Sequence, residues 1–131
     1  MSREAAPEAF PKSLRLRRRG EFRRVQSRGR RIHTPHFLII LHPRPDGGQK
    51  LGITVTKKVG TAVQRNRVKR LVREVFRHHR RRFPADAEVV VIAKRDAPTL
   101  GQREVAGELL GVERAMHAAL RRANRNGGAR R

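Results

Sequence analysis

The chain has 131 residues, which is enough for one domain with a single modest hydrophobic core. Its 33 Lys and Arg against 11 Asp and Glu give a formal net charge of +22, which indicates a polyanionic partner, either nucleic acid or an anionic membrane. The absence of cysteine excludes disulfide bonds, a disulfide-linked partner and a thiolate zinc site, and it permits a reducing compartment such as the cytoplasm.

A membrane is the weaker of the two candidate partners. The sequence has no apolar run of about 18 residues, no signal-peptide core, and no Trp or Tyr that could anchor the chain at a membrane surface. We therefore expect a cytoplasmic protein that binds nucleic acid and has no membrane partner.

The first basic stretch, residues 13–31, carries nine arginines. Phe22 and Val25 are spaced three apart and Gly29 can end a helix, so the pattern predicts a short helix from about Arg18 to Arg28. The alternative for this stretch is a solvated basic tail.

Two strands are expected next. Residues 36–42 (HFLIILH) are a continuous apolar run with β-branched content, which predicts a buried strand. The turn residues of 43–48 (PRPDGG) and a second strand over 50–56 then predict a hairpin. The second strand alternates between an apolar face and a small face that carries Thr54 and Thr56. These threonines are either phosphate or ribose contacts or ordinary strand residues.

The central helix is the best specified element. Thr61 and Gln64 have the spacing of a capping box, so a helix is predicted to begin at Thr61. Apolar residues then recur at helical spacing and predict one packing stripe: Val68, Leu71, Val72, Val75 and Phe76. At about 100° per residue, a basic arc with one amide lies beside the stripe: Asn66, Lys69, Arg70, Arg73 and Arg77. Such a concentration of charge costs self-repulsion unless a polyanion is bound.

The remaining elements are a break at residues 83–86, a strand from Glu88 to Ala93, a loop over 94–101 and a final helix from Gln102 to Ala123. The order α-β-β-α-β-α predicts an α+β fold, an α/β sandwich in which helices pack on a small mixed sheet.

Three segments follow from this organisation: a disordered lead over residues 1–12, one RNA-binding domain over 13–123, and a flexible basic tail over 124–131. Six of the eleven acids lie between residues 84 and 113. We therefore expect the C-terminal part of the domain to turn away from the polyanion.

No catalytic set is recognisable in the sequence. His78 and His79 are adjacent, so on a helix they diverge by about 100° and do not share a metal easily, and the other histidines are scattered. No clustered pair of acids could hold two metals for phosphodiester hydrolysis. We expect no catalytic residue on this chain. Asn66 is either a metal ligand through its amide oxygen or a hydrogen-bonding partner of RNA or of a neighbouring side chain.

The segment KKVGTAVQRNRVKRLVRE over residues 57–74 resembles the signature of the protein subunit of bacterial ribonuclease P. That signature is a strand ending in Lys-Lys, then Gly-x-Ala-Val-x-Arg-Asn-Arg-x-Lys-Arg-x-x-Arg-Glu. The resemblance extends over about residues 13–122, because Leu14 to Val25 is similar to the family's first basic helix.

The resemblance implies a function. In this family the catalyst is an RNA, and the protein binds that RNA, contacts the 5′ leader of precursor tRNA and favours the divalent metal, Mg²⁺, that cleavage needs. It also implies an unusual left-handed βαβ crossover, against the usual right-handed rule. The residues that would face the catalytic RNA and its metals are Lys57, Lys58, Arg65, Asn66, Arg67, Lys69, Arg70 and Arg73. Those that would line the leader cleft are Phe22, Gln26, Ile40, Thr54 and Thr56. Gln26 and Ile40 occupy positions where many members have an aromatic residue. Fewer aromatic rings are therefore expected to stack on the leader in this protein.

Two other functions compete with this hypothesis. A ribosomal or general RNA-binding protein would share the charge and size, but it has no need for the R-N-R-x-K-R helix joined to a G-I-T-V-T-K-K strand. A self-sufficient metal-dependent nuclease would need the carboxylate cluster that the sequence lacks. The type of RNA subunit, the stoichiometry, the metal ligands and further substrates are left open.

Overall fold

The computed structural model describes residues 14–44 and 48–129, with side-chain surroundings as far as residue 123. The expected lead over 1–12 lies outside the described residues. The helices and strands, in chain order, are α1 Arg19–Arg28, β1 Arg30–His33, β2 Phe37–Pro43, β3 Lys50–Thr54, α2 Ala62–His78, β4 Ala87–Ala93, α3 Gln102–Leu110 and α4 Glu113–Ala129. Short 3-10 turns lie at η2 Lys57–Val59, η3 Arg80–Arg82 and η4 Ala97–Thr99.

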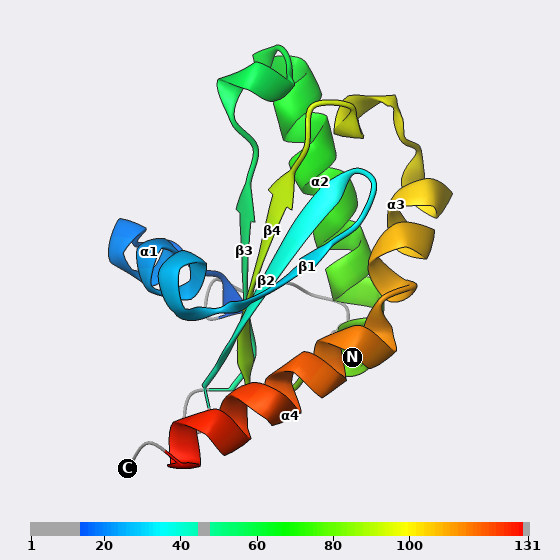
Figure 1. Ribbon diagram of the computed structural model, residues 1–131. Helices are drawn as coiled ribbons and strands as arrows, with labels where there is room; N and C mark the ends of the chain where they lie inside the picture. The colour runs from blue at the N-terminus through cyan, green and yellow to red at the C-terminus, as the bar shows by residue number, and fades with distance from the viewer. Residues whose placement is uncertain (1–13, 45–47, 130–131) are drawn as a thin grey trace, which may run out of the picture.

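The four described strands form one mixed sheet in the order β1-β2-β4-β3 (Figure 1). β1 pairs antiparallel with β2, β2 pairs antiparallel with β4, and β3 pairs parallel with β4. The α+β fold with a small mixed sheet is therefore confirmed. β3, α2 and β4 make the expected βαβ unit; the hand of its crossover stays a prediction of the resemblance.

The predicted hairpin between residues 36–42 and 50–56 is wrong. β2 and β3 do not pair, because β4 lies between them and bonds to both. The reason is burial: nearly every residue of β4 is buried, so this strand needs neighbours on both edges and helices on both faces. β3 is the better edge strand, because it is short and ends at Thr54.

Three further elements differ from the sequence-based expectation. Residues 30–33 form β1, although they were included in a basic stretch with no strand. The single final helix is two helices, which are separated by a turn at Gly111 and Val112. α4 also continues to Ala129, so the tail expected from residue 124 is helical up to that residue.

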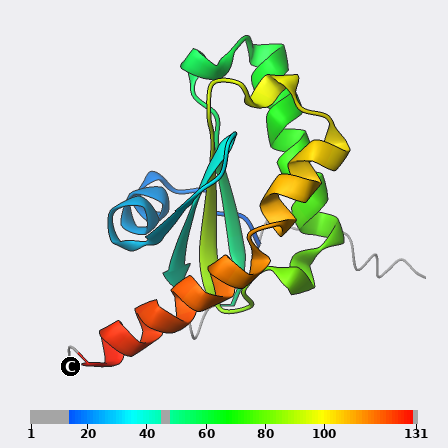
Figure 2. The same ribbon diagram turned by 45° about the vertical axis from the view of Figure 1, so that its right-hand side comes forward.

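The two faces of the sheet are covered unequally. α2, α3 and α4 cover one face, where the main core joins Phe37, Ile39 and Val91 of the sheet to Phe76 and Met116 of the helices. Of the described helices, α1 alone lies on the other face, where a small second cluster forms: Leu16, Val25, Ile40 and Val90 (Figures 1 and 2). The face beneath α1 is therefore the one on which part of the sheet stays open.

α2 matches its prediction closely. Gln64 N donates to Thr61 Oγ1 at 3.2 Å and Thr61 N donates to Gln64 Oε1 at 2.8 Å, which completes the capping box. Val68, Val72, Val75 and Phe76 are buried, and Leu71 is half-buried against the same core. The apolar stripe thus fixes which side of α2 faces solvent.

A buried carboxylate holds α1 on the sheet. Glu88 of β4 is 1% exposed and accepts a hydrogen bond from Arg24 of α1. His42 Nδ1 and Arg44 Nε lie 3.4 Å and 3.9 Å from its carboxylate oxygens. A buried charge is costly unless it is paired in this way. The contact ties the position of α1, and of Phe22 on it, to the centre of the sheet.

Candidate nucleic-acid interface

The solvent side of α2 carries a basic surface, which we call the α2 basic face: Asn66, Lys69, Arg70 and Arg73. Asn66, Arg70 and Arg73 are exposed and Lys69 is half-buried. Lys57 and Lys58 are exposed on η2, immediately before the helix, where the buried Val59 anchors the turn to the core. The structure therefore brings six of the eight predicted contacts to the catalytic RNA onto one end and one side of the helix.

The other two of these eight residues point elsewhere. Arg67 lies on the opposite flank of α2, where its Nη1 donates to the Pro98 carbonyl of η4 at 3.2 Å. Arg65 is half-buried, and its Nε donates to the Gly60 carbonyl at 3.2 Å. Both guanidinium groups thus contribute to holding the start of α2 in place, and Arg67 remains exposed.

A hollow of about 180 Å³, which we call the arginine hollow, lies between α2, β3 and the segment before α1. It is lined by Arg15, Leu16, Arg17, Phe22, Leu51, Ile53 and Arg73. Leu16 N donates to the Leu51 carbonyl at 2.8 Å, so the segment before α1 runs beside the free edge of β3. The hollow therefore joins a residue of the α2 basic face, Arg73, to a residue of the predicted leader cleft, Phe22.

Positive charges converge in the arginine hollow. Partial burial lowers the pKa of the Arg73 guanidinium, and the neighbouring charge of Arg15 lowers it further. Both effects destabilise the charged form of Arg73. An anion bound in the hollow would stabilise that form. Arg15 and Arg17 were not among the predicted site residues. The run of arginines before α1 was visible in the sequence, but its position beside β3 was not.

The Phe22 ring packs on β3 at Gly52, a residue that has no side chain. A Cβ atom added to Gly52 would lie 2.6 Å from Phe22 Cε1 and 3.0 Å from Leu16 Cδ1. Glycine at this position of β3 therefore lets the half-buried ring approach the backbone closely. Thr54, at the end of β3, is half-buried and pairs with Ile92. Thr56 is exposed just beyond the strand.

Gln26 and Ile40 are placed differently from each other. Gln26 is half-buried near the end of α1, and its carbonyl accepts a hydrogen bond from Arg31 Nη2 at 2.9 Å. Ile40 is 0% exposed, and a Cβ on Gly29 would lie 2.5 Å from its Cγ2. The expectation that Ile40 lines a leader cleft is therefore wrong, because the end of α1 covers it.

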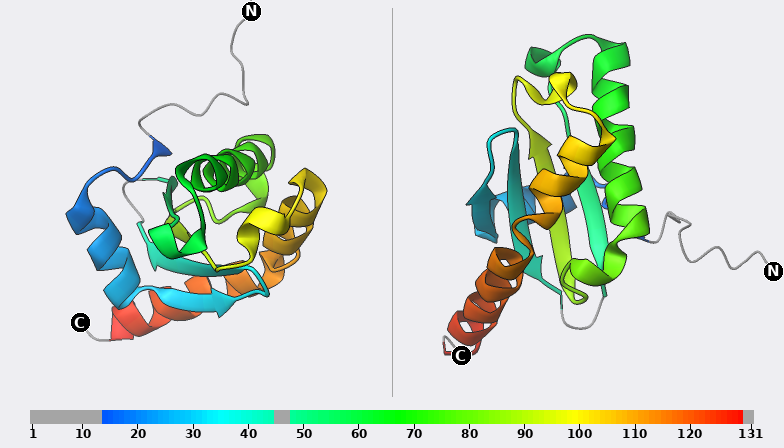
Figure 3. Two further views of the ribbon diagram at one scale, coloured as in Figure 1. Left: turned by 90° about the horizontal axis from the view of Figure 1, so that it is seen from above. Right: turned by 90° about the vertical axis from the view of Figure 1, so that its right-hand side faces the viewer.

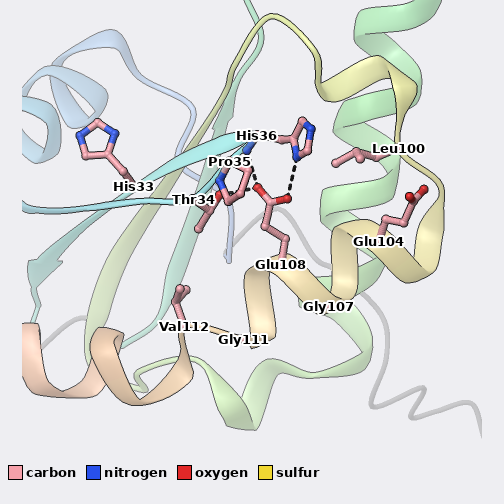
Figure 4. Close-up of a pocket in the computed structure, with 10 residues that line it drawn as sticks. All are labelled: His33, Thr34, Pro35, His36, Leu100, Glu104, Gly107, Glu108, Gly111 and Val112. Carbon is pink, nitrogen blue, oxygen red and sulfur yellow. Dashed lines mark hydrogen bonds and ion pairs between the residues drawn. The ribbon is translucent and has the colours of Figure 1, made fainter.

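A larger hollow of about 580 Å³, which we call the acidic hollow, lies between the β1–β2 turn and α3 (Figure 4). Its polar lining consists of His33, Thr34, His36, Glu104 and Glu108. Glu108 holds the turn: it accepts hydrogen bonds from His36 N at 2.6 Å, from His36 Nδ1 at 2.8 Å and from the Thr34 hydroxyl. Glu104 points away from this network (Figure 4).

The pKa of Glu108 reflects these contacts. Burial acts to raise the pKa, but the hydrogen bonds from Thr34 and His36 outweigh it and hold the pKa below the usual value of 4.5. The carboxylate is thus ionised near neutral pH, which makes this hollow unfavourable for a phosphate.

The described residues contain no group of three or more His, Cys, Asp or Glu side chains that could hold a metal ion. Within residues 14–44 and 48–129, these side chains therefore form no metal-binding centre by themselves. In the same part of the chain, no helix is long and apolar enough to cross a bilayer.

The fold and this surface define a class: an α+β protein whose surface combines arginines and lysines with one aromatic ring and two threonines, one at the end of β3 and one just beyond it. The family model described as Ribonuclease P matches residues 10–122. The chain belongs to the ribonuclease P protein family, the protein components of a tRNA-processing endoribonuclease holoenzyme.

Individual relatives support the same assignment. The ribonuclease P protein component of Desulfovibrio desulfuricans is 48% identical over 111 residues, which cover 82% of this chain and 85% of that protein. The component of Geotalea uraniireducens is 44% identical over 109 residues, 83% of this chain and 96% of that one.

Solved structures agree with the fold. The RNase P protein of Staphylococcus aureus superposes with a TM-score of 0.72 at 28% identity, over 79% of this chain and 95% of that chain. The protein from Thermotoga maritima superposes with a TM-score of 0.69 at 29% identity, over 75% and 93% of the two chains.

Proposed function

We propose that this chain binds the catalytic RNA of ribonuclease P through the α2 basic face together with Lys57 and Lys58. We further propose that it binds the 5′ leader of precursor tRNA along the arginine hollow, Phe22 and the end of β3. The protein then assists removal of the leader to give the mature tRNA 5′ end, with the chemistry on the RNA subunit. A cytoplasmic location, as expected from the sequence, belongs to this proposal.

The observation that carries the proposal is the meeting of Arg73 and Phe22 in one hollow. Arg73 ends the α2 basic face, and Phe22 is a half-buried ring on which an unpaired base can stack. Arg15 and Arg17 stand beside them and suit the phosphates of a single strand. Two RNAs can therefore lie against adjoining parts of one surface, one along α2 and the other along β3 and α1.

Charge explains why a protein helps an RNA to cleave another RNA. Catalytic RNA and precursor tRNA are both polyanions, and their approach is opposed by electrostatic repulsion. A protein with a net charge of +22 lowers this repulsion and releases counterions from both partners, so binding should weaken steeply as salt rises.

We propose that divalent metal is bound by the complex of protein and RNA, not by the protein alone. The described residues supply no protein-only metal centre, and Asn66 offers one exposed amide oxygen beside three basic side chains. Within the proposal Mg²⁺ is bound mainly by RNA, and this chain's residues bind and orient the two RNAs near it.

The test is cleavage of a precursor tRNA at low Mg²⁺ by the catalytic RNA alone, by the protein alone and by the two together. We expect correct cleavage at the mature 5′ end only in the mixture, and we expect the double variant Lys69→Ala/Arg73→Ala to restore the need for high Mg²⁺. Arg103→Ala, an exposed arginine at the start of α3, is the charge control. Cleavage by the protein alone, or no effect of the protein on the RNA, would overturn the proposal.

A further inference from the structure

A second basic cluster lies at the other end of α2. The helix runs directly into residues 78–82, which read His-His-Arg-Arg-Arg. After Glu113 the sequence contains six arginines and no acid. The expectation that the C-terminal part turns away from the polyanion was based on the acids between residues 84 and 113, and these lie before or at the start of α4.

Specific contacts join η3 to α4. Arg82 Nε donates to Glu113 Oε1 at 2.8 Å. His117 Nε2 lies 3.1 Å from the Arg82 carbonyl, and because a carbonyl only accepts, this nitrogen carries the proton and donates. η3, which follows the end of α2, and the start of α4 are therefore docked on each other, as the ribbon also shows (Figures 1 and 3).

This docking gathers five basic side chains, which we call the distal basic patch: Arg81, Arg82, Arg114, His117 and Arg121. Arg114, His117 and Arg121 are spaced i, i+3 and i+7, so they lie on one flank of α4, the flank that meets Arg82. The four arginines are exposed and His117 is half-buried. Beside Arg81 a recess of about 340 Å³ is lined by Gln49, Arg80, Phe83 and Ala85.

Lys57 and Lys58, before the start of α2, and the distal basic patch, beyond its end, are too far apart to share one set of phosphates. α2 has 17 residues, so its ends are separated by about 25 Å. This exceeds the Debye length of about 8 Å at physiological salt, so the charges at the two ends act on different parts of a bound RNA.

The chemistry of the patch favours a double-stranded backbone. Its members are arginines and one histidine, which suit phosphate oxygens, whereas an unpaired leader is better held by a ring such as Phe22. The patch is built on η3, which directly follows α2, and on α4. α2 and α4 cover the same face of the sheet, and α1 covers the opposite face. The patch is thus built from elements on the side of the sheet that α2 covers.

We propose that the distal basic patch binds a second, helical segment of the catalytic RNA through its phosphate backbone. The inference rests on the proposed binding of that RNA by the α2 basic face, which it extends to the opposite end of the helix. The protein would then bridge two RNA segments separated by the length of α2.

The absence of cysteine makes a direct test possible, because a single introduced cysteine can carry a tethered Fe(II)–EDTA group that cuts nearby RNA. Arg81→Cys and Arg121→Cys report on the patch, Lys58→Cys reports on the start of α2, and Glu104→Cys on α3 is the control. All four positions are exposed. In the complex of catalytic RNA, protein and precursor tRNA, we expect tethers at 81 and 121 to cut one shared segment of the catalytic RNA, distinct from the segment cut from position 58.

Each other outcome has a defined meaning. Cuts from position 58 with none from 81 or 121 above the Glu104→Cys level would overturn the patch and leave the proposed function intact. No cuts from position 58 would overturn the proposed function itself. Cuts from 81 and 121 in the precursor tRNA would overturn the assignment to the catalytic RNA.

A binding measurement gives a second, independent readout. Arg81→Ala/Arg121→Ala should weaken binding of the catalytic RNA by about 3–10-fold and lower the salt slope by about 2, because two phosphates would no longer be neutralised by arginine. The matched control is Arg95→Ala/Arg103→Ala, which removes two exposed arginines at the other end of the molecule. An equal weakening in both double variants would mean that only overall charge matters, and it would overturn a specific patch.

Discussion

The arginine hollow beside α2 and the acidic hollow beside α3 differ in size and in charge. The acidic hollow is about 580 Å³ and is lined by Glu104 and Glu108, whereas the arginine hollow is only about 180 Å³ and is lined by Arg15, Arg17 and Arg73. In the first, the carboxylate of Glu108 already has its partners within the protein. In the second, burial and like charge raise the cost of the Arg73 cation. The smaller hollow is therefore the better candidate for a polyanion, because charge outweighs volume for this kind of ligand.

The largest expected effect comes from reversing one charge in each hollow. Arg73→Glu should weaken binding of the catalytic RNA by about 10–100-fold, which is about 1.4–2.7 kcal/mol, because it both removes a phosphate contact and repels the backbone. Glu104→Lys, a change of the same size and opposite sign, should change the affinity by less than about threefold. Filter binding at several salt concentrations measures both, and equal effects of the two reversals would contradict the distinction between the hollows.

A second comparison uses Gly52, which contacts Phe22 of the arginine hollow, and Gly107, which lines the acidic hollow. Gly52→Ala should displace the Phe22 ring, because the new Cβ would lie 2.6 Å from Cε1; the expected cost is about 1–3 kcal/mol of stability. The preference of the holoenzyme for precursor over mature tRNA should fall by about 3–10-fold, since the ring would be displaced from the leader path that we propose.

Gly107→Ala in the acidic hollow is the matched control. A Cβ at Gly107 meets nothing within 4 Å, so the substitution should stabilise α3 by about 0.5–1 kcal/mol and leave RNA binding unchanged. Thermal melts and competitive binding with both tRNA forms check the pair. An unaltered leader preference in Gly52→Ala would count against Phe22 as a leader contact.

The smallest effect is a dependence of stability on pH at the acidic hollow. The pKa of Glu108 is held below 4.5 in the folded protein, so the unfolded state binds the proton more readily. The stabilisation is present in full above about pH 4.5 and is lost as the pH falls through the folded-state pKa. Urea unfolding of the wild type and Glu108→Gln at about pH 6 and pH 3 should show a difference that narrows at the lower pH. A difference that widens on acidification would contradict the direction of this shift.

The parts of the molecule that could be predicted are those with local signals. α2 was predictable because its capping box, its apolar stripe and its basic arc all lie within one continuous stretch. The basic surface followed from the same stretch, so six of the eight residues expected to face the catalytic RNA lie together. Arg65 and Arg67 were added to this set by the family resemblance alone, and neither belongs to the basic arc that the helical spacing predicts.

The parts that were missed depend on contacts between distant residues. The turn signals at residues 43–48 suggested a hairpin, but the partner of β2 is decided by β4, a strand buried on both faces. The burial of Ile40 depends on the end of α1, and the arginine hollow depends on a bond between Leu16 and Leu51. None of these pairings leaves a periodic or compositional trace in one sequence.

The central position of β4 also has a consequence for how the chain is made. β1 and β2 are adjacent in sequence and can pair early, but β3 has its strand partner only when residues 87–93 have left the ribosome. α2, with its basic face, is thus synthesised before the sheet on which it packs is complete. Contacts of such long sequence separation slow folding, so a nascent chain would spend part of its synthesis with an unpaired strand edge and a concentrated positive charge in a cell rich in RNA.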